Sequence, residues 1–111
     1  MVPVAWRPEG AEALIHVSGL ASHTRDLLDH PQASLMLMAE LAEGESAQAL
    51  PRLTVQAEAR PIPKDTPEYD AARQTYLARF PAAEITFGLG DFQLFTLVPV
   101  SARFVAGFGS A

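Results

Sequence analysis

The sequence contains no cysteine, which excludes disulfide bonds and thiolate metal sites. Only 19% of its 111 residues are charged, and eight are lysine or arginine against 13 acidic residues. A formal net charge of −5 with scattered basic residues argues against nucleic acid, which needs a clustered basic face. No apolar run is long enough to span a membrane, and no signal-peptide pattern opens the chain. We therefore expect a cytoplasmic protein with neither nucleic-acid nor membrane partners.

Hydrophobic residues are abundant in the chain, at 49% of the total. A chain of this length suits one domain, here residues 1–111, with a modest core. Because so few residues are charged, we expect part of the apolar surface to be buried against a second subunit. The composition therefore predicts a homodimer.

Periodicity predicts an α+β domain that is mainly β. A period-two alternation over 53–60 indicates a half-buried strand. Asp65 or Thr66, followed by Pro67, is typical of a helix start. The stripe formed by Tyr69, Ala72, Tyr76 and Phe80 is typical of core packing. The predicted strands are 2–6, 12–17, 33–40, 53–62, 92–98 and 102–108, and the predicted helices are 20–29 and 66–80.

The strand predicted over 33–40 carries apolar residues on both faces. We expect the face with Leu35, Leu37 and Ala39 to lie in the interior. The face with Met36 and Met38 is predicted to contact the partner subunit, although methionine is also a common core filler.

The stretch from 13 to 31 predicts a strand that turns through Ser18 and Gly19 into a helix. His23, Thr24 and Arg25 lie near the start of that helix. Free N–H groups, hydroxyls and a guanidinium at such a place suit a phosphate. The alternative interpretation is a helix cap with a solvated face.

Three separated motifs resemble one family. The first is SGLASHTRDLLDHPQASLML at 18–37, the second is PRLTV at 51–55, and the third combines GDF at 90–92 with VAGFG at 105–109. Together they resemble the pyridoxamine 5′-phosphate oxidase-like, FMN-binding split-barrel proteins, in the branch that contains haem-utilisation proteins. The resemblance implies an antiparallel, six-stranded split β-barrel with flanking short helices. It also implies that the family's first N-terminal strand is absent here.

The resemblance further implies an FMN site. Ser18, His23, Thr24 and Arg25 would hold the phosphate end, and Arg52 and Thr54 would reach the flavin ring across a dimer interface. The implied function is that of an FMN-dependent oxidoreductase with an unknown small-molecule substrate. No catalytic residue is assigned.

The alternative is a haem-binding or haem-degrading split-barrel protein, or a non-catalytic flavin-binding remnant. Haem would need an axial histidine in an apolar pocket. We expect His16 to be a core or interface residue, and His30 to lie at a helix end where a cation suits the dipole. No metal site is predicted.

Overall fold

The computed structural model describes residues 3–8, 10–38 and 51–105. These residues form an α+β fold, mainly β, with one five-stranded antiparallel sheet and three α-helices. The elements in chain order are β1 (Ala5–Trp6), β2 (Ala13–Ser18), α1 (Ser22–Asp29), β3 (Gln32–Met38), β4 (Arg52–Pro61), α2 (Pro67–Arg79), the 3-10 turn η2 (Pro81–Ala83), α3 (Glu84–Phe87) and β5 (Phe92–Val105).

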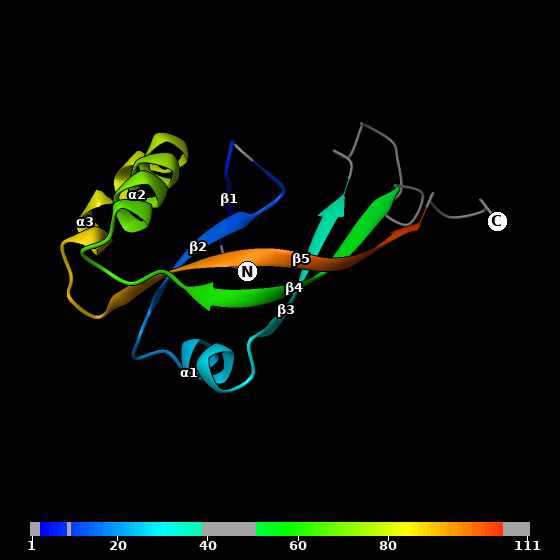
Figure 1. The fold of residues 1–111 in the computed structure, drawn as a ribbon, viewed down its shortest axis with the longest axis horizontal. Helices are drawn as coiled ribbons and strands as arrows, with labels where there is room; N and C mark the ends of the chain where they lie inside the picture. Colours follow the sequence, from blue (N-terminus) through cyan, green and yellow to red (C-terminus); the bar gives the residue numbers. More distant parts are fainter. Residues whose placement is uncertain (1–2, 9, 39–50, 106–111) are drawn as a thin grey trace, which may run out of the picture.

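Strand β5 is the central strand of the sheet, whose order is β1-β2-β5-β4-β3 (Figure 1). Its first half pairs with β2, from Phe92 opposite Ser18 to Leu97 opposite Ala13. Its pairing with β4 runs almost its full length, and ends at Val105 opposite Arg52. Every other strand is therefore placed directly or indirectly by β5.

The two strands predicted over 92–98 and 102–108 are one strand over the described residues. Ala57 lies opposite Pro99 and Gln56 opposite Ser101, so Val100 is an extra residue in the ladder. Such a β-bulge tolerates a proline that cannot donate to the ladder. The prediction of a strand break at Pro99 was therefore wrong. With five strands in the described part, and no pairing there between β1 and β3, the predicted closed barrel of six strands is not confirmed.

Two hydrophobic clusters lie on opposite faces of the sheet. Side chains alternate along β2, so Ile15 and Val17 face α1 while Leu14 and His16 face α2 and α3. Leu27 of α1 packs on the first cluster. In Figure 1, α1 lies on one side of the sheet and α2 and α3 on the other. The described helices cover only the end of the sheet where β2 lies, and the far end of β4 and β5 extends beyond them.

The predicted second helix is confirmed as α2. Thr66 is its N-cap and accepts a hydrogen bond from the Tyr69 backbone N–H at 3.2 Å. Ala72 and Tyr76 are buried, and Tyr69 and Phe80 pack beside them as the aromatic stripe predicted.

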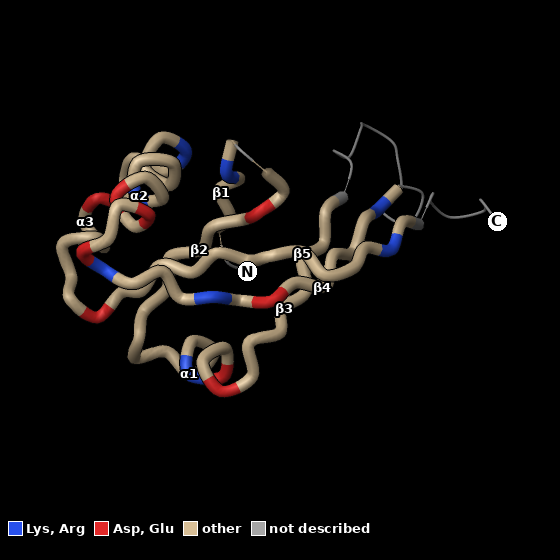
Figure 2. Tube along the Cα trace, viewed as in Figure 1, with Lys and Arg blue, Asp and Glu red and all other residues tan. Residues whose placement is uncertain are grey.

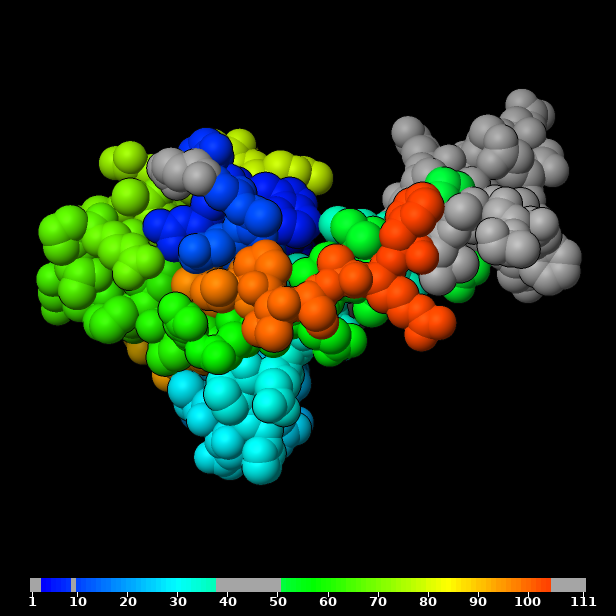
Figure 3. Space-filling view, turned by 45° about the vertical axis from the view of Figure 1, so that its right-hand side comes forward, coloured from blue at the N-terminus to red at the C-terminus, as the bar shows by residue number. Residues whose placement is uncertain are grey.

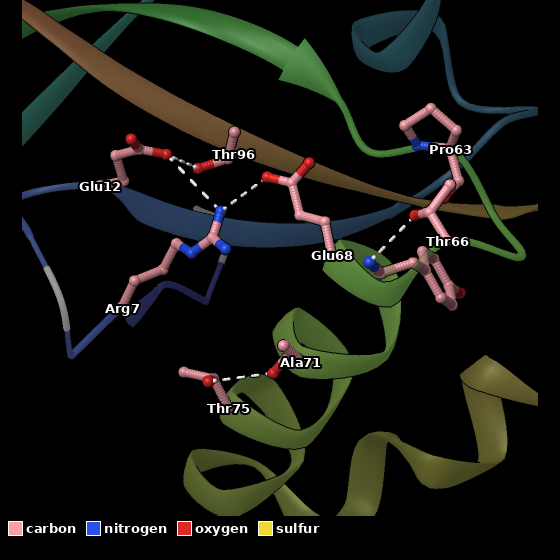
Figure 4. A network of polar contacts seen from close by, with 9 residues as sticks. Arg7, Glu12, Pro63, Thr66, Glu68, Ala71, Thr75 and Thr96 are labelled. Carbon is pink, nitrogen blue, oxygen red and sulfur yellow. Dashed lines mark hydrogen bonds and ion pairs between the residues drawn. The ribbon is translucent and has the colours of Figure 1, made fainter.

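A polar network ties the β1–β2 hairpin to α2 (Figure 4). The Arg7 guanidinium lies 3.2 Å from the Glu68 carboxylate and 3.6 Å from that of Glu12. The Glu12 carboxylate also accepts a hydrogen bond of 2.8 Å from the Thr96 hydroxyl on β5. The pair of Arg7 and Glu12 therefore links the hairpin both to α2 and to β5.

The two faces of β3 differ as expected at its start. Ala33 and Leu35 pack against the α1-side cluster, whereas Met36 is 60% exposed. The predicted interior residue Leu37 is 38% exposed. The side chains of Met38 and Ala39, the predicted loop at 41–50 and the motif at 106–109 lie outside the described residues.

In the described part no helix has the length and hydropathy to cross a bilayer. Figure 2 shows lysine and arginine scattered along the chain.

The structure predicts a stability difference between two glycines. A Cβ at Gly19 would lie 2.8 Å from the backbone oxygen of Asp91, whereas a Cβ at Gly10 would meet no atom within 4 Å. We expect Gly19→Ala to lower the free energy of unfolding by roughly 1–3 kcal/mol, because backbone must move. Gly10→Ala is the matched control and should change it by less than about 1 kcal/mol. Equal denaturant midpoints for the two variants would contradict this close approach.

Candidate functional site

The segment between β2 and α1 is fixed to the start of β5. The Ser18 hydroxyl donates to the Asp91 carboxylate at 3.0 Å and accepts from the Leu20 backbone N–H at 3.2 Å. The Gly19 N–H donates to the Asp91 backbone oxygen. Ser18, a predicted ligand contact, is therefore already engaged by a carboxylate in this structure.

The other three predicted phosphate contacts lie in the first turn of α1 and differ in their exposure to solvent. No side chain caps this helix, and its first turn contains no acidic residue. Thr24 is fully buried, and its hydroxyl has no hydrogen-bond partner among the described residues. His23 and Arg25 are exposed, and the Arg25 guanidinium donates to the Leu20 carbonyl at 3.4 Å. Only His23 and Arg25 of this group therefore lie at the surface.

Arg52 and Thr54 lie at the opposite end of the sheet. Ser18 pairs with Phe92 at the start of β5, whereas Arg52 pairs with Val105 at its end. At 3.2–3.4 Å per residue, this places Ser18 and Arg52 roughly 40 Å apart along the strand. Thr54, opposite Arg103, is only slightly closer. Within one chain the structure does not bring the six predicted residues into one site.

A cavity of about 450 Å³ opens where three chain segments meet beside the Ser18 loop. Buried Ile62 and Leu94 form its floor, and exposed Leu20 and Lys64 lie at its rim. The complete lining is Gly19, Leu20, Pro61, Ile62, Pro63, Lys64, Gly90, Asp91, Gln93 and Leu94. Most of these side chains are apolar, and Lys64 is the one basic residue among them. The lining therefore combines apolar surface with one cation, Lys64, and one carboxylate, Asp91.

His16 is buried beside this region, as expected of a core histidine. Its ring stacks on Phe87, with centroids 3.8 Å apart and planes inclined by 9°, and the ring of Tyr76 meets its edge. The Thr86 hydroxyl donates to the Ala83 carbonyl at 2.8 Å. A hydroxyl has a single hydrogen, so Thr86 must accept from Nδ1 of His16, 3.3 Å away. The lone pair of Nε2 is then left without a donor among the described residues.

The buried environment of His16 keeps its imidazole neutral. Burial, and secondarily the charge of Lys64, lowers the pKa of His16 from 6.5 to about 4. Burial also raises the pKa of Tyr76. The histidine therefore acts as an uncharged part of the aromatic packing over the sheet.

Sequence reasoning missed the cavity and Lys64. The segments that line it lie at 19–20, 61–64 and 90–94, and no local pattern relates them. The sequence offered one hint that Lys64 is unusual, because it is the sole lysine of the chain.

Comparisons with known proteins give matches along nearly the whole of this chain. The haem oxygenase HutZ of Vibrio cholerae is 36% identical over 112 residues, which cover 98% of this chain and 61% of HutZ. The chloroplast haem oxygenase HOZ of Arabidopsis thaliana is 33% identical over 111 residues, which cover 100% of this chain and 32% of HOZ. No model of a known protein family matches.

Solved structures agree with the sequence matches. A haem-binding protein from Mycobacterium smegmatis superposes with a TM-score of 0.83 at 30% identity, over 98% of this chain and 43% of that one. The structure of HutZ from Vibrio cholerae, described as a haem storage protein, superposes with a TM-score of 0.75 at 29% identity, over 96% and 73%. This chain is thus similar, along nearly its whole length, to HutZ, HOZ and a haem-binding protein.

The homologues overturn the prediction of an FMN-dependent flavoprotein oxidoreductase. The relatives named above are haem oxygenases and haem-binding proteins, which favours the alternative interpretation. The motif at 18–37 is thus compatible with haem proteins and does not by itself indicate flavin. This chain spans 61% and 32% of the lengths of the two curated relatives.

The lowered pKa of His16 predicts an acid-sensitive fold. Between pH 6.5 and about 4 the unfolded chain binds a proton at this residue that the folded chain does not. The free energy of unfolding should therefore fall as pH falls through this window, by about 2–3 kcal/mol in total. His16→Phe should remove this contribution, and the exposed His23→Gln should retain it. Denaturant titrations at several pH values measure the slopes, and equal slopes for wild type and His16→Phe would reject the assignment.

Proposed function

We propose that this chain binds haem, as the haem-binding portion of a protein that degrades or stores it. The observation that carries the proposal is the match to two haem oxygenases along 98% and 100% of the chain. The HutZ superposition, which covers 96% of this chain, supports it. Because the chain spans only part of its curated relatives, the activity of a whole protein is part of the proposal.

The chemistry of the cavity supports a porphyrin ligand. Leu20, Ile62 and Leu94 offer apolar surface for a macrocycle, and the volume of about 450 Å³ lies within the usual range of ligand pockets. The lining offers no imidazole to iron, because His16 is enclosed by aromatic rings and His23 and His30 are outside it. The lining therefore offers apolar surface to a porphyrin body and one cation to a carboxylate, and it offers no ligand to the iron.

Haem, when bound, would supply iron and oxygen chemistry that the side chains of this chain lack. The role of this chain would be to bind and orient the macrocycle. The apolar lining, with Ile62 and Leu94 buried, would exclude water from ring surface packed on it, and Lys64 could hold a carboxylate.

Haem titration followed by the Soret absorbance tests the proposal. We expect a saturable spectral change, and an affinity roughly 10-fold lower in Leu20→Asp, because a carboxylate would replace apolar contact with the porphyrin. Leu28→Asp is the matched control, since Leu28 is an exposed leucine of α1 outside the cavity. No saturable change in the wild type would reject haem binding. Equal losses in both variants would place haem elsewhere on the chain.

We also propose a homodimer and a split-barrel arrangement of the sheet. The apolar face under α1 continues along β3, β4 and β5, where Leu37, Leu53 and Phe104 form one row across the strands. Leu37 is 38% and Phe104 65% exposed, and Met36 on the opposite face is 60% exposed. In Figure 3 the orange and red end of β5 extends as an arm away from the body, on the side opposite the green residues that lead into α2. A second copy packed on this arm would cover surface that one chain leaves in water.

The dimer proposal predicts that a charge on the arm weakens self-association. Phe104→Glu should lower the apparent mass in light scattering at micromolar concentration, because a carboxylate cannot be buried unpaired in an apolar contact. Ile85→Glu is the control, since Ile85 is 77% exposed on α3 and distant from the row. Met36→Glu tests whether the methionine face takes part. A monomeric wild type would reject the proposal.

A further inference from the structure

Lys64 is the sole lysine of the chain, and it lies on the rim of the apolar cavity. The ammonium group donates one hydrogen bond, to the Gly90 carbonyl at 3.2 Å. Across residues 3–8, 10–38 and 51–105, no carboxylate lies within 4.0 Å of it to form an ion pair. A lysine ammonium has three donors, so Lys64 retains capacity for an anion.

The acidic residue of the cavity is already engaged. The Asp91 carboxylate accepts the Ser18 hydroxyl at 3.0 Å. That contact anchors the Ser18 loop to β5 but leaves the Asp91 carboxylate charged, so the lining holds one acidic group as well as the Lys64 ammonium.

The backbone holds Lys64 in a defined place. Pro61 and Pro63 restrict the chain as it leaves β4, and the buried Ile62 donates its N–H to the Leu94 carbonyl at 2.9 Å. On the other side, Asp65 has a φ of 63°, a turn conformation that aspartate tolerates. The Thr66 hydroxyl then bonds back to the Pro63 carbonyl at 2.7 Å. The position of the lysine Cα is therefore restrained before any ligand binds.

We propose that the Lys64 ammonium binds a carboxylate of the ligand whose apolar body occupies this cavity. The inference rests on the proposed haem function, in which the carboxylate is a haem propionate. Haem carries two propionates, and this chain has a formal net charge of −5, so its overall field repels the ligand. A local cation beside an apolar wall offsets that repulsion and selects the orientation in which propionate points to the rim.

Haem and haem dimethyl ester, titrated in parallel, test the contact because the ester keeps the macrocycle and loses the carboxylates. We expect Lys64→Met to raise the dissociation constant for haem by about 10-fold, the usual size of one charge-assisted contact. The same variant should bind the ester as wild type does, and Lys64→Arg should retain most of the haem affinity.

Arg79→Met is the charge-matched control. Arg79 lies at the far end of α2, roughly 18 Å along the helix from its start, and it is not part of the cavity lining. Its loss should leave the dissociation constant for haem within about 2-fold. A loss as large as that of Lys64→Met would show that net charge alone matters, and would overturn the inference.

The single lysine allows a second readout that does not depend on variants. An amine-reactive reagent can modify only Lys64 and the chain's α-amino group, so a mass spectrum of the Lys64 peptide reports its accessibility directly. Haem should slow modification of Lys64, and the ester should slow it less. Haem binding with unchanged modification, or with equal affinity in Lys64→Met, would overturn the role of Lys64 and leave the proposed function standing. No haem spectrum in the wild type would overturn the proposed function itself.

Discussion

The hydrogen-bonded pairing of β5 on both of its sides is the constraint on which the rest of the structure depends. Its first residues hold β2, and β4 follows it to Val105. The bulge at Val100 lets the strand continue past a proline that would otherwise end the ladder. Because the β1–β2 and β3–β4 pairs both attach to one long strand, the start of β5 becomes the place where distant segments meet.

The candidate cavity follows from that arrangement. The loop after β2, the exit of β4 and the turn into β5 converge at one end of the sheet, and each contributes a wall. The hydrogen bond from the Ser18 hydroxyl to the Asp91 carboxylate joins the loop after β2 to the turn into β5. The hydrogen bond from the Lys64 ammonium to the Gly90 carbonyl joins the exit of β4 to the same turn. These polar contacts lie around an apolar floor, which is the composition expected of a site for an amphipathic ligand.

The two faces of the sheet have different roles. On the face under α2 and α3, the aromatic packing encloses His16 and suppresses its charge. On the face under α1, the apolar rows continue beyond the helix to Leu37 and Phe104. On the first face, helices of this chain cover the part beside β2. The second is left partly in water, which is why we propose that a second copy completes it.

The sequence by itself determined the local elements. The alternation over 53–60, the Thr66 cap with Pro67 and the stripe of Tyr76 each depend on neighbours within a few residues, so they could be recognised without the fold. The burial of His16 followed likewise from its apolar strand. Tertiary structure decided the rest. Pro99 marks a break in any local pattern, and only pairing with β4 shows a continuous strand with a bulge. Ser18 and Arg52 lie in matching motifs, yet strand register places them at opposite ends of the sheet. Lys64 becomes a candidate ligand contact only because long-range strand pairing brings it close to Gly90 and Leu20. Contacts between segments far apart in sequence leave no periodic pattern in the sequence, so they could not be predicted from it.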